Sequence, residues 1–233
     1  MKIISFLLFF SSFHCFSQAT VTDKSGNVYK TVKIGAQIWM AENLRTEKFN
    51  NGDPIEQITS NRYWQEISGF AMNDTTLEEI YPEMCYYNNT KQKNNALYNY
   101  YVILDSRGVC PTGWHIPSFE EFEELIEYLG GSHNDTEKAN NKLKSTSSWK
   151  VNGTNSSGFN ALAIGIRVGS GEFSYKTEET EFWTDDIYME EYGDIIEFHG
   201  WGLLINSDKN STREFGIGHF TMGMAGSIRC IKN

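Results

Sequence analysis

The sequence predicts a single small α+β domain in which short strands outnumber helices, and three observations support this prediction. First, the chain of 233 residues contains 20 glycines but only 4 prolines, and 14% of its residues are aromatic. This composition is typical of many turns and of aromatic packing between short strands. Second, apolar and polar residues alternate near the start of the chain. Third, one segment near the middle has the pattern of a capped amphipathic helix.

The first predicted elements form a β-hairpin. Turn-forming residues at 23–27 lead into residues 28–34, where apolar side chains alternate with polar ones as in a half-buried strand. The dipeptide Gly35-Ala36 provides a tight return into a second strand at 37–40. Residues 56–84 have mixed polarity and scattered acidic side chains, so we interpret them as loop or short helix.

The clearest helix begins after Ser118, a good N-cap, and Glu121 stands three residues later, as a capping box requires. The apolar stripe at helical spacing consists of Phe119, Phe122, Leu125, Ile126 and Leu129. We interpret the glutamates within 120–124 as a solvated helix face, although a carboxylate pair is also what a glycoside hydrolase needs. The dipeptide Gly130-Gly131 ends this helix, and a shorter one is predicted over 136–144.

The C-terminal part is predicted to consist mostly of strands. A short buried strand is predicted over 161–166, and further strands separated by glycine-rich turns lead to a last strand at 226–232. We find no long linker, low-complexity tract or internal repeat. We therefore expect one domain over residues 20–233.

The N-terminal residues 1–19 have the pattern of a secretory signal peptide. Lys2 provides a positive start, residues 3–10 are almost all apolar, and small residues up to Ala19 offer a cleavage site. The apolar run is much shorter than the ~20 residues that cross a bilayer, so the protein is not expected to span a membrane. We expect a secreted or cell-envelope protein, and a lipoprotein acylated at Cys15 is the alternative.

Export makes a disulfide plausible among Cys85, Cys110 and Cys230. We predict the pair Cys110–Cys230, because each lies at the edge of a strand-like or turn segment and the bridge would tie the end of the chain to its middle. Cys85 lies in an aromatic run and is interpreted as a small buried hydrophobic residue. None of the three has a Cys-x-x-Cys partner, which excludes a zinc ribbon or a thioredoxin-like site.

The acidic charge and the missing motifs argue against several classes of function. A net charge of −10 without a Lys/Arg-rich stripe disfavours binding to nucleic acids. The chain has no Gly-x-Ser-x-Gly elbow, phosphate-binding loop or dinucleotide fingerprint, so no catalytic residues are predicted. His133, His199 and His219 look isolated, without metal-ligand spacing, so no metal ligands are predicted.

A series of short motifs runs through nearly all of the chain after residue 22. The most specific is Cys110–Pro117, with the sequence Cys-Pro-Thr-Gly-Trp-His-Ile-Pro. The other motifs occupy residues 26–35, 37–44, 86–89, 96–100, 142–144, 158–162 and 227–230. In this order they resemble the Fibrobacter succinogenes major paralogous domain family. That resemblance implies a secreted or surface protein of a Bacteroidetes-type bacterium, in agreement with the predicted signal peptide.

The terminal segment 227–230, which ends in Arg-Cys, is also similar to the last strand of the formylglycine-generating type of domain. This resemblance implies a C-type-lectin-like fold, with two helices flanking a twisted, mostly antiparallel sheet and with the termini close together. Residues 216–225 are richer in Gly and Met than this pattern, which leaves the pairing of the final strand open.

In a lectin-like fold, the main candidate binding site is the cluster of Trp183, Asp185 and Asp186. An exposed Trp ring would stack on a sugar, and the carboxylates would bind its hydroxyls or a Ca²⁺ ion. The alternative is a core Trp beside a solvated acidic turn. His115 is a second candidate, either as a ligand contact or as a structural side chain hydrogen-bonded beneath the helix start.

Two functions from different classes follow from the sequence. The first is an exported, non-catalytic module that binds a glycan or a protein at the cell envelope, or that serves a structural role. The second is an enzyme related to the formylglycine-generating type, which would need two reactive cysteines close in space. A bridge between Cys110 and Cys230 would leave only Cys85 free, which favours the first function.

Overall fold

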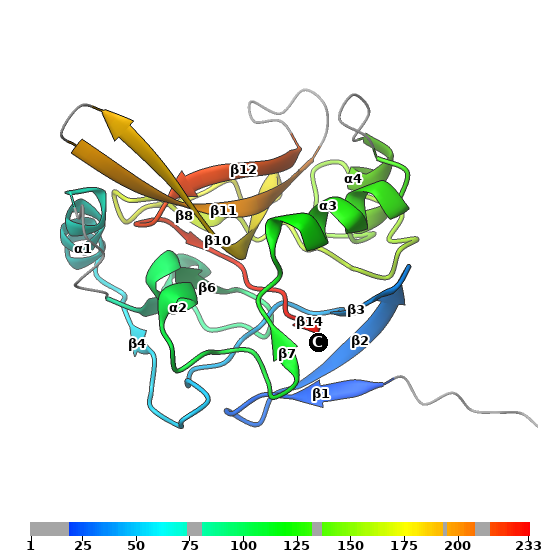
Figure 1. Cartoon of the computed structure of the whole chain (residues 1–233), viewed down its shortest axis with the longest axis horizontal. Helices are drawn as coiled ribbons and strands as arrows, with labels where there is room; N and C mark the ends of the chain where they lie inside the picture. Colours follow the sequence, from blue (N-terminus) through cyan, green and yellow to red (C-terminus); the bar gives the residue numbers. More distant parts are fainter. Residues whose placement is uncertain (1–18, 74–80, 132–136, 193–194, 208–214) are drawn as a thin grey trace, which may run out of the picture.

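The computed structural model describes residues 19–73, 81–131, 137–192, 195–207 and 215–233. The predicted signal peptide over residues 1–19 falls almost wholly outside these ranges, as do Cys15 and His133. The described residues form an α+β fold with three mostly antiparallel sheets (Figure 1). The resemblance implied a single sheet flanked by two helices, whereas the described strands form three separate sheets.

One sheet joins the two ends of the described chain. Its five strands, in spatial order, are β1 (Thr20–Thr22), β2 (Val28–Ile34), β3 (Gln37–Met40), β14 (Ile231–Lys232) and β7 (Trp114–His115). The predicted N-terminal hairpin is confirmed, since Ile34 pairs with Gln37 across its turn. The C-terminal strand pairs with this hairpin, with Ile231 opposite Trp39.

A second sheet has six short strands. They are, in spatial order, β4 (Glu56–Gln57), β5 (Glu83–Tyr86), β6 (Ala96–Asn99), β13 (Ala225–Gly226), β8 (Ile166–Arg167) and β9 (Phe173–Ser174). The last strand, predicted over 226–232, is therefore divided between two sheets. The predicted strand over 161–166 is also wrong, except that Ile166 begins β8. The chain turns before this point, because Ile164 N donates to Leu162 O and Gly165 has a φ of +74°.

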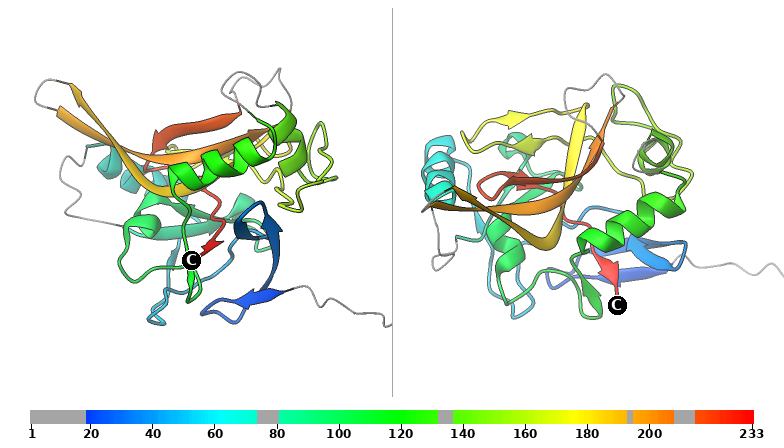
Figure 2. Two further views of the ribbon diagram at one scale, coloured as in Figure 1. Left: turned by 45° about the vertical axis from the view of Figure 1, so that its right-hand side comes forward. Right: turned by 45° about the horizontal axis from the view of Figure 1, so that its top comes forward.

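The third sheet contains much longer strands than the composition predicted. It consists of β10 (Glu179–Tyr192), β11 (Ile195–Asn206) and β12 (Gly216–Thr221), all antiparallel. The end of β10 and the start of β11, which are paired, project from the body of the molecule (Figures 1 and 2). Helix α3 (Phe119–Tyr128) lies across the opposite part of this sheet (Figure 2).

Helix α3 has the predicted start. The Ser118 hydroxyl accepts from Glu121 N at 3.2 Å, and the Glu121 carboxylate accepts from Ser118 N at 2.9 Å, which completes the capping box. The other helices of the described chain are α1 (Asn61–Asn73), α2 (Tyr100–Leu104), α4 (Glu137–Leu143) and a short 3₁₀ segment, η1 (Tyr87–Asn89). Of these, α4 matches the predicted second helix.

Helix α1 occupies the region interpreted as loop or short helix. It forms because Trp64 and Ile67 bury one face of it. Trp64 Nε1 and the Ser68 hydroxyl both donate to Gly223 O, which fixes the helix against the segment before β13.

No helix in the described ranges is both long enough and apolar enough to cross a membrane.

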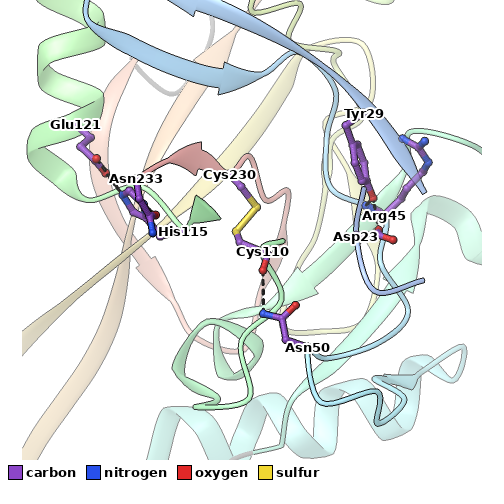
Figure 3. Close-up of a disulfide and its surroundings, with 9 residues drawn as sticks. All are labelled: Asp23, Tyr29, Arg45, Asn50, Cys110, His115, Glu121, Cys230 and Asn233. Atoms are coloured by element: carbon purple, nitrogen blue, oxygen red, sulfur yellow. Dashed lines mark hydrogen bonds and ion pairs between the residues drawn. A yellow bond between two sulfur atoms is a disulfide. The ribbon is translucent and has the colours of Figure 1, made fainter. Parts of the chain in front are cut away.

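The predicted disulfide is confirmed: Cys110 and Cys230 are bridged across a separation of 120 residues (Figure 3). Asn50 Nδ2 donates to Cys110 O at 2.8 Å and joins a further loop to this bridge. Next to it in the sequence, the fully buried Arg229 donates to Met40 O, Phe159 O and Asn43 Oδ1. The terminal Arg-Cys motif therefore holds together the N-terminal sheet and the core.

Candidate functional site

The start of helix α3 brings together most of the residues selected from the sequence. Strand β10 has a register shift between Trp183 and Ile187, so Thr184, Asp185 and Asp186 lie in a β-bulge. Asp185 N donates to Pro117 O at 3.1 Å, and Asp186 Oδ2 accepts from Phe119 N at 2.6 Å. The bulge is therefore fixed against the first turn of the helix.

His115 is held by hydrogen bonds on both sides of its ring at this position. Its Nε2 lies 3.0 Å from both carboxylate oxygens of Glu121, and its Nδ1 lies 2.7 Å from Asn233 Oδ1 (Figure 3). Both ring nitrogens are thus engaged, one by the helix start and one by the C-terminal residue. The structure agrees with the alternative of a structural side chain hydrogen-bonded beneath the helix start.

Trp183 does not present a face to solvent, so its proposed role as an exposed sugar-stacking ring is wrong. Its relative exposure is 0%, and its Nε1 donates to Tyr98 O at 2.8 Å. The ring packs edge-on against Tyr100, with centroids 5.1 Å apart. The register shift after Trp183 explains this difference, since the strand passes from the core to the surface within the bulge.

Asp185 is the exposed acidic side chain of this cluster. Partial desolvation by its neighbours raises the pKa of Asp185, and the charge of Asp186 raises it further, whereas His115 opposes the shift. Asp186 already accepts a hydrogen bond from the helix, so these two carboxylates have different roles. As placed, no group of three or more His, Cys, Asp and Glu side chains among the described residues is able to hold a metal ion. The suggested Ca²⁺ stays a prediction.

An aromatic surface that the sequence did not reveal lies next to this bulge. Alternate residues of β11 share one face of the sheet. Leu203 and Ile205 are buried on that face with the apolar stripe of α3. Trp201 contacts Phe119, the first residue of the helix, with centroids 5.1 Å apart, and it is only half-buried. The same face continues beyond the start of α3 to His199.

Four side chains form this surface, which we call the aromatic face: Tyr188, His199, Trp201 and His219. Tyr188 lies opposite His199 in the β10–β11 pairing, and His219 lies opposite Trp201 in the β11–β12 pairing. The rings of Tyr188 and His219 come from the outer strands and approach to 4.5 Å. They partly cover His199, whose side chain is 15% exposed, while His219 remains exposed.

The aromatic face and the bulge are directly connected. The Thr184 hydroxyl donates to Trp201 O at 3.1 Å and accepts from Asp186 N at 3.2 Å. Tyr188 follows two residues after the bulge, and its ring lies 5.7 Å from that of Trp201. An acidic side chain, Asp185, and half-buried aromatic rings are thus presented on adjoining parts of strands β10 and β11.

The interpretation of His199 and His219 as isolated is wrong, since their ring centroids are 5.1 Å apart. They are 20 residues apart in the sequence, and only the register of β11 with β12 brings them together. A signal was present in the alternation of His199 and Trp201 with glycines, which marks one face of a strand. Without the pairing partners, that pattern does not identify the neighbouring rings.

The comparisons with known proteins agree with the resemblance found in the sequence. No curated protein and no solved structure matches the chain. Residues 32–232, most of the chain and every residue of the site described above except Asn233, match the Fibrobacter succinogenes major domain family. The chain therefore belongs to the Fibrobacter succinogenes major domain family.

Proposed function

We propose that this protein is an exported, non-catalytic module that binds a carbohydrate at the bacterial cell envelope. The observation that carries this proposal is the aromatic face with the acidic bulge beside it. Sugars place their C–H faces against aromatic rings, and they hydrogen-bond through hydroxyl groups to carboxylates and imidazoles. Trp201 and Tyr188, both half-buried, supply the rings, His219 is exposed beside them, and Asp185 is exposed in the adjoining bulge.

Rigid support favours this position over other exposed aromatic residues. Trp201 is held between Phe119 on one side and Tyr188 on the other, in the middle strand of the sheet. Little side-chain freedom is then lost when a ligand binds. Tyr128 is 64% exposed but stands on the surface of α3 over Gly35, and no aromatic ring of the described residues packs against it.

We also propose that the fold is C-type-lectin-like. In support, strands from the two ends of the described chain pair in one sheet, and the Cys110–Cys230 bridge joins the C-terminal end to the chain ahead of β7. The division into three sheets is a departure from the simple form of that architecture. Export is supported by the signal-peptide pattern and by the disulfide, which is typical of oxidising compartments.

Cysteine chemistry favours a non-catalytic module over an enzyme of the formylglycine-generating type. Cys110 and Cys230 form a disulfide bond, so neither has a free thiol. Cys85 is fully buried, and desolvation raises the pKa of its thiol to about 12. A thiolate nucleophile needs a lowered pKa and access to substrate. The environment of Cys85 therefore suits a structural residue.

A glycan-array screen with and without Ca²⁺, followed by calorimetry, tests the proposal. We expect Trp201→Ala to weaken binding of the selected glycan by about tenfold, equivalent to about 1.4 kcal/mol. Tyr128→Ala, which removes an exposed aromatic ring elsewhere, should leave the affinity unchanged. Absence of glycan binding in both conditions, or binding that Trp201→Ala does not affect, would contradict the carbohydrate assignment.

A protein ligand is the second candidate for this region. Ile187 is 40% exposed and Met189 is 61% exposed, both on the β10–β11 hairpin that projects from the body. Exposed apolar side chains on a projecting hairpin are typical of protein contacts. Alternation along the strand places them on the face opposite to Tyr188. Ile187→Ser combined with Met189→Ser would weaken a protein complex but spare carbohydrate binding.

A further inference from the structure

Two histidines of the aromatic face have an arrangement that stacking on a sugar does not require. His199 on β11 and His219 on β12 are diagonal neighbours across the strand pair, since His199 lies opposite Thr221 and His219 opposite Trp201. Their ring centroids are 5.1 Å apart, and their planes are inclined at 79°. Both side chains project from paired strands, so their relative position is well defined.

One nitrogen of this pair lacks a hydrogen-bond partner. His199 Nε2 is buried and accepts or donates no hydrogen bond within the described part of the chain. The carboxylate of Glu197 is close to it, with Oε2 3.6 Å away. A buried polar atom without a partner loses its hydrogen bonds to water and gains none in return, so its presence in a native structure calls for an explanation. His115 differs, because both of its nitrogens are engaged.

We propose that His199 and His219 together bind one divalent transition-metal ion, with the carboxylate of Glu197 balancing its charge. Metal–nitrogen bonds of about 2.1 Å at a tetrahedral angle place two imidazole centroids about 5 Å apart, close to the observed separation. Glu197 Oε2 lies 3.6 Å from His199 Nε2, where its negative charge offsets part of the charge of the ion without completing a group of three ligands.

The chemistry of the donors indicates the class of metal. Imidazole suits Zn²⁺, Cu²⁺ and Ni²⁺, whereas Mg²⁺ prefers oxygen ligands. Two imidazoles leave the remaining coordination positions to water, because the described residues supply no convergent group of three ligands. The affinity is therefore lower than that of a closed four-ligand zinc site, and an open position faces solvent beside the exposed His219.

Isothermal titration of the purified, metal-free protein with Zn²⁺, and with Mg²⁺ as the comparison, tests this proposal. We expect one equivalent of Zn²⁺ to bind and Mg²⁺ to give no comparable heat. His199→Gln and His219→Gln should each weaken Zn²⁺ binding by about tenfold or more. His115→Gln is the matched control and should leave the affinity unchanged. Because His219 is exposed, His219→Gln keeps the test valid even if His199→Gln unfolds the protein.

A spectroscopic readout separates metal ligation from a structural effect. The electron paramagnetic resonance spectrum of the Cu²⁺-loaded protein should show hyperfine coupling to two imidazole nitrogens, and to one in either single variant. Trp201→Ala removes the stacking ring but keeps both imidazoles, so it should weaken glycan binding and preserve metal binding. Absence of saturable Zn²⁺ binding, or Zn²⁺ binding that neither histidine variant weakens, would overturn the proposal.

Discussion

Replacing Glu83 by glutamine should make the stability of the protein less dependent on pH. Glu83 begins strand β5, has a relative exposure of 3%, and its Oε2 has no hydrogen-bond partner. Burial, followed by the charge of Glu56 opposite it in β4, raises the pKa of Glu83 to about 7, and the charge of Arg167 opposes the shift. The folded protein therefore retains a proton on Glu83 that the unfolded chain has released.

The sign and size of the effect follow from this difference. Between the ordinary pKa of 4.5 and the folded value of about 7, the folded state binds more protons, so the free energy of unfolding falls as pH rises. At about 1.4 kcal/mol for each pH unit, the loss amounts to about 3 kcal/mol. It is absent below pH ~4.5 and complete above pH ~7. An amide of the same shape carries no charge at any of these pH values.

Urea unfolding followed by circular dichroism at a series of pH values measures this effect. The difference in unfolding free energy between Glu83→Gln and the wild type should move by about 3 kcal/mol in favour of the variant from pH 4.5 to pH 8. Other titrating groups contribute equally to both proteins and cancel. Glu124→Gln, at an exposed position on α3, is the control and should give a flat difference. Parallel pH profiles for the wild type and Glu83→Gln would refute the reasoning.

Three further predictions concern the core. Replacing Cys110 and Cys230 by serine should lower the free energy of unfolding by about 4–5 kcal/mol, because the bridge closes a loop with a sequence separation of 120 residues, and urea unfolding measures the loss. Gly200→Ala should destabilise the protein by about 1–3 kcal/mol in the same assay, since the new Cβ would lie 2.1 Å from the buried ring of Tyr100; an unchanged midpoint would contradict this packing. Finally, the Cys85 thiol, with a pKa raised to about 12 by burial, should react with a thiol reagent only after unfolding, so rapid labelling of the native protein would be inconsistent with the structure.

Local sequence patterns predicted the elements that local chemistry stabilises. The Ser118–Glu121 capping box specifies the start of α3, because both partners lie within one helical turn. The N-terminal hairpin follows from alternation and from a glycine with φ +61° at its turn, Gly35. The elements predicted least well, α1 and the divided last strand, depend on contacts with distant segments. Trp64 and Ser68 in α1, for example, both donate to Gly223 O.

The candidate site also contains residues that were predicted correctly and one that was not. The sequence identified His115 and the acidic pair Asp185 and Asp186, and the structure brings all three to the start of α3. The prediction that Trp183 is exposed was wrong, because a register shift in β10 decides which side of the strand is buried. Such a shift cannot be recognised from composition or from the spacing of residues.

By itself, the sequence determined the family, the α+β class, the start of the central helix and the pairing of Cys110 with Cys230. Only the tertiary structure decided which side chains form the aromatic face. Its four rings come from three strands, and strand register assembles them. Register depends on burial summed over whole strands and on where helix α3 stops covering the sheet, and neither can be derived from short-range patterns.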